Sequence, residues 1–134
     1  MRTIKFRAWD TKKQQMTGFE FAVTSNGSWL TPYFKLPGEF WKRENTSRLV
    51  VMQSTHLIDQ NNREIYEGDI VKISKIIKEP WIIGWNEAEG RWSFVYDTGE
   101  VGRNIVPSEI KRLKVIGNIY ENPELLKAND PPSN

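Results

Sequence analysis

The chain has one imidazole and no thiol, which limits the covalent and metal chemistry available to it. His56 is the only histidine and there is no cysteine, so neither a histidine pair nor a cysteine ligand set can form within one chain. His56 could act with a carboxylate, but we expect it to be a surface or turn residue. The sequence contains no Gly-x-Ser-x-Gly nucleophile pattern and no glycine-rich phosphate loop. We therefore predict no catalytic residue, no metal site and no cofactor.

Three carboxylates, Glu64, Glu67 and Asp69, form the densest acidic group in the chain. Carboxylates at this spacing could hold Mg²⁺ or act as a general acid and base. They surround Gly68, however, and an aspartate in a turn commonly accepts hydrogen bonds from the turn amides. We favour this structural interpretation, in which Asp69 bonds the turn and Glu67 is solvated.

Basic residues next to aromatic ones could stack nucleic-acid bases while contacting phosphates. The candidates for such a surface are Arg7, Trp9, Lys42, Arg43, Arg91 and Trp92. The net charge is only +2, however, and like charges do not gather in blocks. Tryptophan and phenylalanine also fill small cores efficiently. Single-stranded nucleic-acid binding is therefore the alternative hypothesis, and an enzyme of unknown class is the third.

Aromatic residues are abundant, with 6 Trp, 4 Tyr and 6 Phe among 134 residues. Most fall on strand-like segments, where they are expected to fill the core. A group in the proline-interrupted segment 29–48 has no regular spacing: Trp29, Tyr33, Phe34, Phe40 and Trp41. Aromatic side chains outside a core are typical anchors of protein interfaces. We therefore predict a non-catalytic, self-associating interaction protein that uses this segment as its contact surface.

Composition indicates one soluble folded domain. Hydrophobic residues make up 38% and charged residues 27% of the chain, a balance typical of globular proteins. No apolar run approaches the ~20 residues needed to span a bilayer, so we expect a cytoplasmic protein with no membrane contact. We predict a single β-rich domain over residues 1–128 and a frayed tail over residues 129–134.

Alternating apolar residues predict strands near the N-terminus. Ile4, Phe6 and Ala8 share one side of the first run. After a polar break at residues 10–14, a second run contains Phe19, Phe21 and Val23, and together the two runs predict a hairpin.

The C-terminal half contains the clearest strand signals. Residues 81–85 and 91–96 flank a loop that ends in Gly90, which predicts a second hairpin. Further strands are expected at residues 49–53, 70–73 and 113–119, with a polar turn at residues 59–62 and a bulge at Gly117. Residues 70–77 also have isoleucines at helical spacing, so a helix is the alternative prediction for this segment. Asn122 followed by Pro123 predicts a capped helix start.

These elements predict a mainly β fold, that is, a β-rich α+β fold. The expected architecture is a small antiparallel barrel with an N-terminal β-hairpin and a short C-terminal helix. The segment from about residue 65 to residue 121 looks like an SH3-like barrel. A fold analogy of this kind carries no function with it.

Three separated segments, in this order, resemble the YopX family of small phage and prophage proteins. They are Ile4-Lys5-Phe6-Arg7-Ala8-Trp9-Asp10, Glu64-Ile65-Tyr66-Glu67-Gly68-Asp69-Ile70-Val71-Lys72 and the stretch from Val115 to Leu126. The resemblance implies a phage or prophage origin, a host-cytoplasm setting and self-association, with a host or phage protein as a further partner. It assigns no activity to any residue.

The chain departs from the family pattern at two glycines. Family members tend to have Thr-Gly-Leu before the central motif and Asn-Gly in the turn that follows. This chain has Thr55-His56-Leu57 and Asn61-Asn62 at those places. Glycine adopts positive φ without steric cost, whereas asparagine tolerates it less well and histidine less well again. The loss of both glycines therefore bears directly on the backbone conformation at His56 and Asn62.

Overall fold

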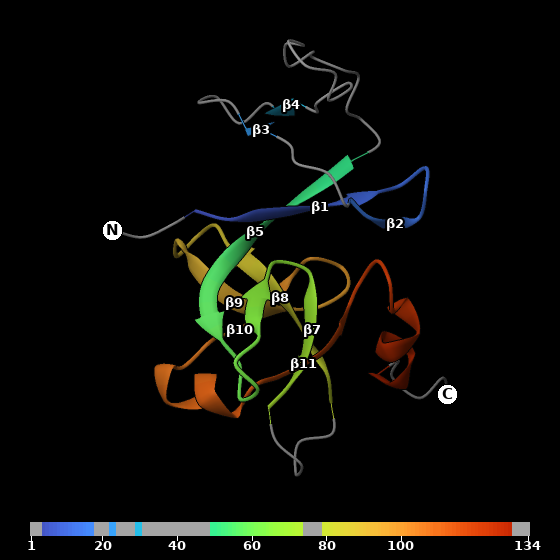
Figure 1. The fold of residues 1–134 in the computed structure, drawn as a ribbon. Coiled ribbons are helices and arrows are strands. Elements are labelled where there is room, and N and C mark those ends of the chain that lie inside the picture. The colour runs from blue at the N-terminus through green and yellow to red at the C-terminus, as the bar shows by residue number, and fades with distance from the viewer. Residues whose placement is uncertain (1–3, 18–21, 24–28, 31–48, 74–78, 130–134) are drawn as a thin grey trace. The chain divides into compact units, whose positions relative to one another are not determined.

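The computed structural model describes residues 4–17, 22–23, 29–30, 49–73 and 79–129. The chain divides into two compact units, a larger one of residues 1–6 and 52–134 and a smaller one of residues 7–51. Nearly all regular elements in the described ranges are strands and the two helices are short 3₁₀ helices (Figure 1). The predicted mainly β fold class is therefore confirmed. The sequence-based domain limits, 1–128 with a frayed tail, stay a prediction.

The smaller unit begins with a tight hairpin. Strand β1 (Phe6–Asp10) pairs antiparallel with β2 (Gln15–Met16), and Trp9 lies opposite Met16. Asp10 Oδ1 accepts hydrogen bonds from two amides of the turn, which satisfies backbone donors that have no strand partner. An N-terminal hairpin is therefore present, but its second strand is Gln15–Met16, which precedes the run that was predicted to form it. Val23 belongs to a separate pair, β3 (Ala22–Val23) with β4 (Trp29–Leu30).

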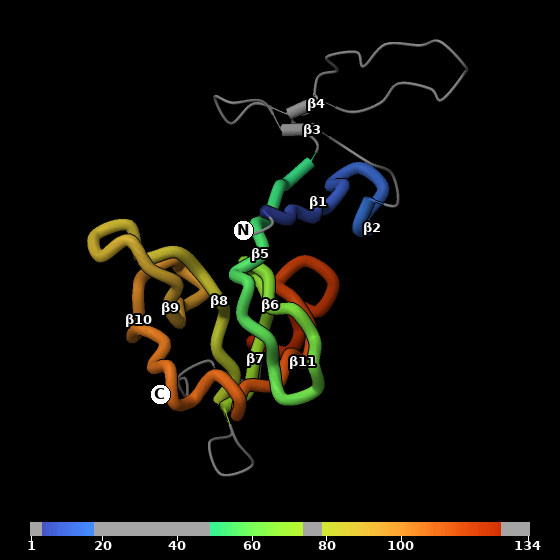
Figure 2. Tube along the Cα trace, turned by 60° about the vertical axis from the view of Figure 1, so that its left-hand side comes forward, coloured from blue at the N-terminus to red at the C-terminus, as the bar shows by residue number. Residues whose placement is uncertain are grey.

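The larger unit is built on a five-stranded antiparallel sheet that curls into a half-barrel (Figures 1 and 2). Its strands lie in the order β10 (Val101–Asn104), β9 (Arg91–Val95), β8 (Trp81–Asn86), β7 (Asp69–Lys72) and β11 (Lys114–Asn118). Residues 69–72 are a strand, so the helical alternative is wrong there, because β7 is paired with β8 and β11 on its two sides. The predicted SH3-like character of this unit stays a prediction.

The predicted hairpin of residues 81–96 forms the middle of this sheet. Strands β8 and β9 pair in continuous register from Ile82 opposite Val95 to Asn86 opposite Arg91. Gly90 closes the loop with a φ of +64° and donates its N–H to Asn86 O at 2.7 Å. Ile83 and Phe94 lie opposite each other and are buried. They belong to the core together with Ile65, Val71, Ile73, Ile105, Leu113 and Val115.

Strand β5 (Leu49–Ile58) is twice the length predicted, because it continues beyond Gln53 to pair with β6 (Glu64–Tyr66). The register of this pair shifts between Ser54 and Ile58. His56 has a φ of +64° inside the shifted segment, and Asn62 has a φ of +62° in the turn that follows. Both positions where family members tend to carry glycine therefore have the left-handed backbone that favours glycine.

Replacing His56 by glycine should stabilise the protein. A left-handed backbone costs a non-glycine residue about 1–2 kcal/mol, and the greater freedom of glycine in the unfolded chain returns about 0.5–1 kcal/mol of this. We therefore expect His56→Gly to raise the free energy of unfolding by about 0.5–1 kcal/mol, measured by urea denaturation.

Asn62→Gly is the matched comparison for His56→Gly. Asparagine tolerates positive φ better than histidine, so its replacement should bring a smaller gain. A loss of stability in His56→Gly would show that the contacts of the imidazole outweigh the relief of backbone strain.

The polar turn predicted at residues 59–62 is confirmed, and Asp59 organises it. Asp59 is 4% exposed. Its Oδ1 accepts the N–H groups of Asn61 at 2.8 Å and Arg63 at 2.9 Å, and its Oδ2 accepts the N–H of Val115 at 2.9 Å. Gln60 N–H also donates to Leu113 O at 2.9 Å. One carboxylate therefore joins the β5–β6 turn to the start of β11.

Asp59→Asn should cost about 1–3 kcal/mol of stability, because an amide cannot accept from all three N–H groups. Burial raises the pKa of the Asp59 carboxyl, but the three N–H donors and Arg63 outweigh it, so the folded pKa lies below its usual range. The stabilisation is then fully present above the ordinary aspartate pKa and is lost as the pH falls through the lowered folded pKa. The unfolding free energies of wild type and Asp59→Asn should therefore converge in acid; a pH-independent difference would contradict this.

The predicted last strand is β11, and its register shifts between Val115 and Gly117, where a bulge was expected. The following turn is tied by two asparagines. Asn118 Oδ1 accepts from the N–H groups of Tyr120 and Glu121, and Asn122 Oδ1 accepts from the N–H of Asn118. A 3₁₀ helix, η2 (Pro123–Asn129), begins at the predicted residue. The predicted capping role of Asn122 is wrong, because its side chain bonds Asn118 instead.

Two elements of the larger unit have no counterpart in the sequence-based prediction. Strand β10 forms the edge of the sheet, and a short 3₁₀ helix, η1 (Pro107–Arg112), connects it to β11. Glu109 fixes this connection by accepting from Val106 N–H at 2.9 Å and from Arg103 Nη1 at 2.8 Å. Neither element has a clear apolar alternation in its sequence.

Candidate functional site

Two aromatic pairs lie at the two ends of the β8–β9 hairpin. Alternation places every second residue of a strand on the same face. The buried pair Ile83 and Phe94 therefore shares a face with aromatic neighbours on both sides. Trp81 and Tyr96 lie at the open end of the hairpin, and Trp85 lies directly opposite Trp92 at the loop end. The core ends before the hairpin does, so aromatic rings reach the surface at both ends.

Trp81 and Tyr96 have ring centroids 5.4 Å apart with an interplanar angle of 46°. Trp81 also contacts Phe94, at 5.7 Å between centroids, and packs against the core. A Cβ atom on Gly102 would lie 2.4 Å from Cζ3 of Trp81. The indole therefore rests on the bare backbone of β10, and Tyr96, which is 50% exposed, extends the aromatic surface outward.

Gly102→Ala should move the Trp81 ring, because the added methyl group would occupy the space that the indole fills. We expect a change in the chemical shift of the Trp81 indole N–H and a loss of stability. Gly90→Ala is the control, since a Cβ there meets nothing within 4 Å and only the positive φ is strained. An unchanged Trp81 signal in Gly102→Ala would contradict the proposed support of the ring.

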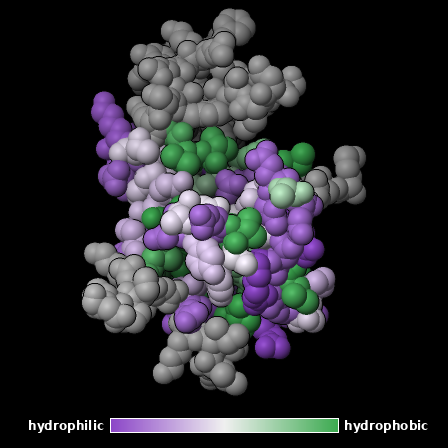
Figure 3. Space-filling view, turned by 180° about the vertical axis from the view of Figure 1, so that it is seen from behind, coloured by the Kyte–Doolittle hydropathy of each residue, from purple (hydrophilic) through white to green (hydrophobic). Residues whose placement is uncertain are grey.

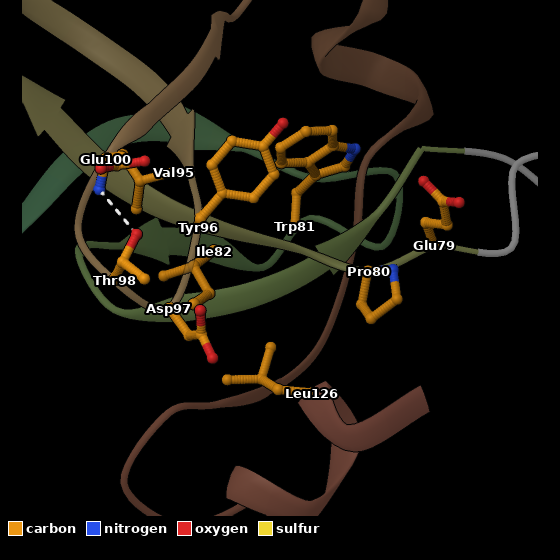
Figure 4. Close-up of a pocket in the computed structure, with 10 residues that line it drawn as sticks. All are labelled: Glu79, Pro80, Trp81, Ile82, Val95, Tyr96, Asp97, Thr98, Glu100 and Leu126. Carbon is orange, nitrogen blue, oxygen red and sulfur yellow. Dashed lines mark hydrogen bonds between the residues drawn. The ribbon is translucent and has the colours of Figure 1, made fainter. Parts of the chain in front are cut away.

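A groove of about 490 Å³ lies next to this pair, and we call it the η2 groove. Its lining consists of Glu79, Pro80, Trp81, Ile82, Val95, Tyr96, Asp97, Thr98, Glu100 and Leu126. In Figure 4 the rings of Trp81 and Tyr96 stand side by side on one side of the hairpin, while Ile82 and Asp97 point to the other side, toward Leu126 of η2. Apolar side chains from the sheet and from η2 therefore form the walls.

Among the described residues, the charged ones that line the η2 groove are all acidic. They are Glu79, Asp97 and Glu100, and each is exposed. Thr98 also lines the groove, and its hydroxyl accepts the N–H of Glu100 at 3.4 Å (Figure 4). An apolar slot with carboxylates at its rim suits a side chain that has an apolar stem and a cationic end.

A second cavity, of about 300 Å³, lies at the other end of the hairpin, and we call it the tryptophan pocket. It is lined by Gln53, Glu67, Trp85 and Trp92. The two indoles meet edge to face, with centroids 5.0 Å apart and planes at 74°. Glu67 N–H donates to Gln53 O at 2.9 Å, which holds the two polar residues side by side. Burial raises the pKa of the Glu67 carboxyl.

The acidic group singled out from the sequence does not act as a unit. Asp69 is fully buried and its Oδ2 accepts the N–H of Tyr66 at 2.8 Å, as the structural interpretation predicts. Glu64 forms an ion pair with Lys5 at 3.7 Å. Glu67 is half-buried, so its predicted solvation is wrong. Within the described ranges, no three acidic or histidine side chains are placed to hold a metal ion.

His56 occupies a strained position in β5, as its φ shows. Its N–H donates to Ser54 Oγ at 3.1 Å. Its Nε2 is buried and has no hydrogen-bond partner in the part of the chain that the structure describes. Nε2 of His56 therefore makes no hydrogen bond to any carboxylate in the described part of the chain.

The residues predicted for a nucleic-acid surface are not all accessible. Trp9 is 5% exposed and Arg7 is half-buried. Arg91 is exposed and donates to Ile105 O at 3.0 Å, while Trp92 lines the tryptophan pocket. Lys42 and Arg43 lie outside the described residues.

The predicted interface residues are largely outside the described part of the chain. Trp29 is in β4, and Tyr33, Phe34, Phe40 and Trp41 are not described. That surface therefore stays a prediction.

Sequence reasoning missed the η2 groove. The signal was present in the alternation of residues 81, 83 and 85 and of residues 92, 94 and 96, which places the aromatic pairs in line with the core. No sequence pattern indicated the contribution of Leu126, because it depends on where η2 lies against the sheet.

On the face that Figure 3 shows, hydrophobic residues lie in separate patches among hydrophilic ones. No described helix is long and apolar enough to cross a membrane.

Comparison with known proteins gives a family and several similar solved structures, among them the following two. A family model described as YopX protein matches residues 5–127. The crystal structure of protein EF1440 from Enterococcus faecalis is 27% identical, with a TM-score of 0.59, and the match covers 92% of this chain and 98% of that chain. The crystal structure of protein yopX from Bacillus subtilis is 25% identical, with a TM-score of 0.56, and the match covers 94% and 97% respectively. No curated protein matches the chain.

Proposed function

The chain belongs to the YopX protein family, and we propose that this member is a non-catalytic interaction protein that binds a basic segment of a partner protein in its η2 groove. The observation that carries the proposal is the combination of apolar walls with three carboxylates, which are the charged groups among the described lining residues. In the phage or prophage setting that the family resemblance implies, the partner is a host or phage protein in the host cytoplasm.

The apolar walls supply the first part of the recognition. Pro80 directly precedes β8, Ile82 lies at the start of β8 and Leu126 lies in η2, and all three line one groove. Lysine and arginine bury their aliphatic stems along such surfaces while their charged ends stay in water. A groove of about 490 Å³ accommodates a few side chains of an extended segment, and does not enclose a folded domain.

The carboxylates supply the second part. Asp97, Glu79 and Glu100 give the groove a local charge opposite to the net +2 of the chain. Charge complementarity of this kind favours a cationic partner and raises its association rate. The exposed face of Tyr96 adds a surface over which a guanidinium or ammonium can lie.

The same charges weigh against the alternative of single-stranded nucleic-acid binding at this groove. Phosphate contacts require basic side chains along the path of the strand, whereas the η2 groove presents carboxylates. The tryptophan pocket likewise contains Glu67 and no basic residue in its lining. Nucleic-acid binding is therefore the second hypothesis, and neither the η2 groove nor the tryptophan pocket favours it.

An array of immobilised heptapeptides, probed with the purified protein, tests the proposal. We expect the bound peptides to be enriched in arginine and lysine next to apolar residues. Asp97→Lys should abolish this enrichment, because it places a cation at the rim of the groove.

Glu87→Lys is the matched control. Glu87 is exposed in the loop between β8 and β9, so this variant has the same change in net charge without altering the groove lining. Equal losses in both variants would attribute binding to the overall field of the protein, and no basic preference in the wild type would contradict the proposal directly.

The self-associating form of the proposal takes the basic segment from a second copy of the chain. Lys42 and Arg43 directly follow Trp41 in the sequence and have the required chemistry. Light scattering of the wild type and of Asp97→Lys separates this form from binding to a different protein. A wild type that stays strictly monomeric at high concentration would contradict self-association.

A further inference from the structure

We propose that the tryptophan pocket is a second binding site, and that it accepts an alkylated ammonium group such as a methylated lysine side chain or a quaternary amine. This site is distinct from the η2 groove, because the two cavities share no lining residue. It does not depend on the function proposed above.

The arrangement of the two indoles carries the inference. Trp85 and Trp92 are directly paired across the β8–β9 hairpin, and their planes meet at 74°. Two nearly perpendicular rings form a corner, so a compact group placed there touches both π surfaces. The negative face of an indole attracts a cation more strongly than the face of any other side chain.

The corner is both rigid and open. Trp92 packs against the buried core cluster, and Trp85 packs on Trp92. Trp85 is nevertheless 47% exposed. The indole of Trp85 is half exposed to water and is held in place by Trp92. It therefore presents a preformed surface to a ligand.

Glu67 supplies the charge that selects a cation. Its carboxyl lines the pocket and is half-buried, and the rise in its pKa shows that burial disfavours the ionised form. A bound cation would relieve that cost. Gln53 is the other polar residue of the described lining, and this lining includes no basic side chain.

The same lining explains why the ammonium should be alkylated. A primary ammonium carries three N–H donors that need acceptors, and the indole rings that form most of the corner offer none. An alkylated ammonium has a weaker hydration shell and presents methyl groups to the rings, which is the chemistry that aromatic cages recognise. The cavity of about 300 Å³ leaves space for such a group and the start of its stem.

Titration of the ¹⁵N-labelled protein with tetramethylammonium chloride tests the proposal, with sodium chloride used to keep the ionic strength constant. We expect saturable shifts of the indole N–H signals of Trp85 and Trp92, which are assigned from Trp85→Leu and Trp92→Phe spectra. Trp85→Leu should weaken binding about 5-fold, the size of one cation–π contact. Glu67→Gln should also weaken it.

Two controls separate this recognition from its competitors. Uncharged tert-butanol has a similar shape to tetramethylammonium and should cause no comparable shift. Glu124→Gln removes a carboxylate from the exposed first turn of η2 and should leave the affinity unchanged, as should Asp97→Lys in the η2 groove. Because Asp97→Lys abolishes only the peptide binding proposed above, failure of either proposal can be recognised separately.

Three results would overturn the inference. They are the absence of a saturable shift, equal shifts with tert-butanol, and an affinity that does not change in Trp85→Leu. Trp85 is half exposed, so its replacement should leave a folded protein with a dispersed amide spectrum. That variant therefore gives an answer even if Glu67→Gln fails to fold.

Discussion

The buried carboxylate of Asp59 is the constraint on which much of the larger unit depends. It accepts three backbone N–H groups, two from its own turn and one from Val115, which is 56 residues away in the chain. Because β11 pairs with β7, and β7 pairs with β8, the position of the turn is transmitted through the sheet to the hairpin that carries both cavities.

The motifs that reveal the family contain residues that hold the fold together. Asp69 bonds Tyr66 N–H next to Gly68, which has a φ of +85°. Asn122 packs so closely on Gly117 that a Cβ there would lie 2.5 Å from its Oδ1. The resemblance seen in the sequence is confirmed by the family match, and the structure explains why these residues serve as its signature. The two cavities draw on neighbouring residues: Glu67 belongs to the central motif and Leu126 to the last one, while the tryptophans belong to neither.

The two cavities share one origin in the β8–β9 hairpin. One row of alternating side chains runs along the hairpin. Its central residues, Ile83 and Phe94, are buried, and the aromatic pairs at its two ends reach the surface. What differs between the ends is the set of charges that other elements bring. Residues near β8 and β9 surround the η2 groove with carboxylates, whereas the turn before β7 brings Glu67 to the tryptophan pocket. The hairpin therefore provides the aromatic surface, and residues next to it provide the carboxylates.

The sequence by itself determined the mainly β class, the β8–β9 hairpin, the polar turn at residues 59–62, the bulge near Gly117 and the family. Each of these follows from local alternation or turn chemistry, which neighbouring residues encode. It also pointed to His56 and Asn62, whose positive φ the structure then showed. Only the tertiary structure decided that residues 69–72 form a strand, because pairing on both sides of the strand outweighs the helical spacing of its isoleucines. It also decided that Val23 pairs with β4. It alone brought Leu126, Glu67 and Gln53 to their cavities, since contacts between residues distant in the chain depend on packing that no local pattern records.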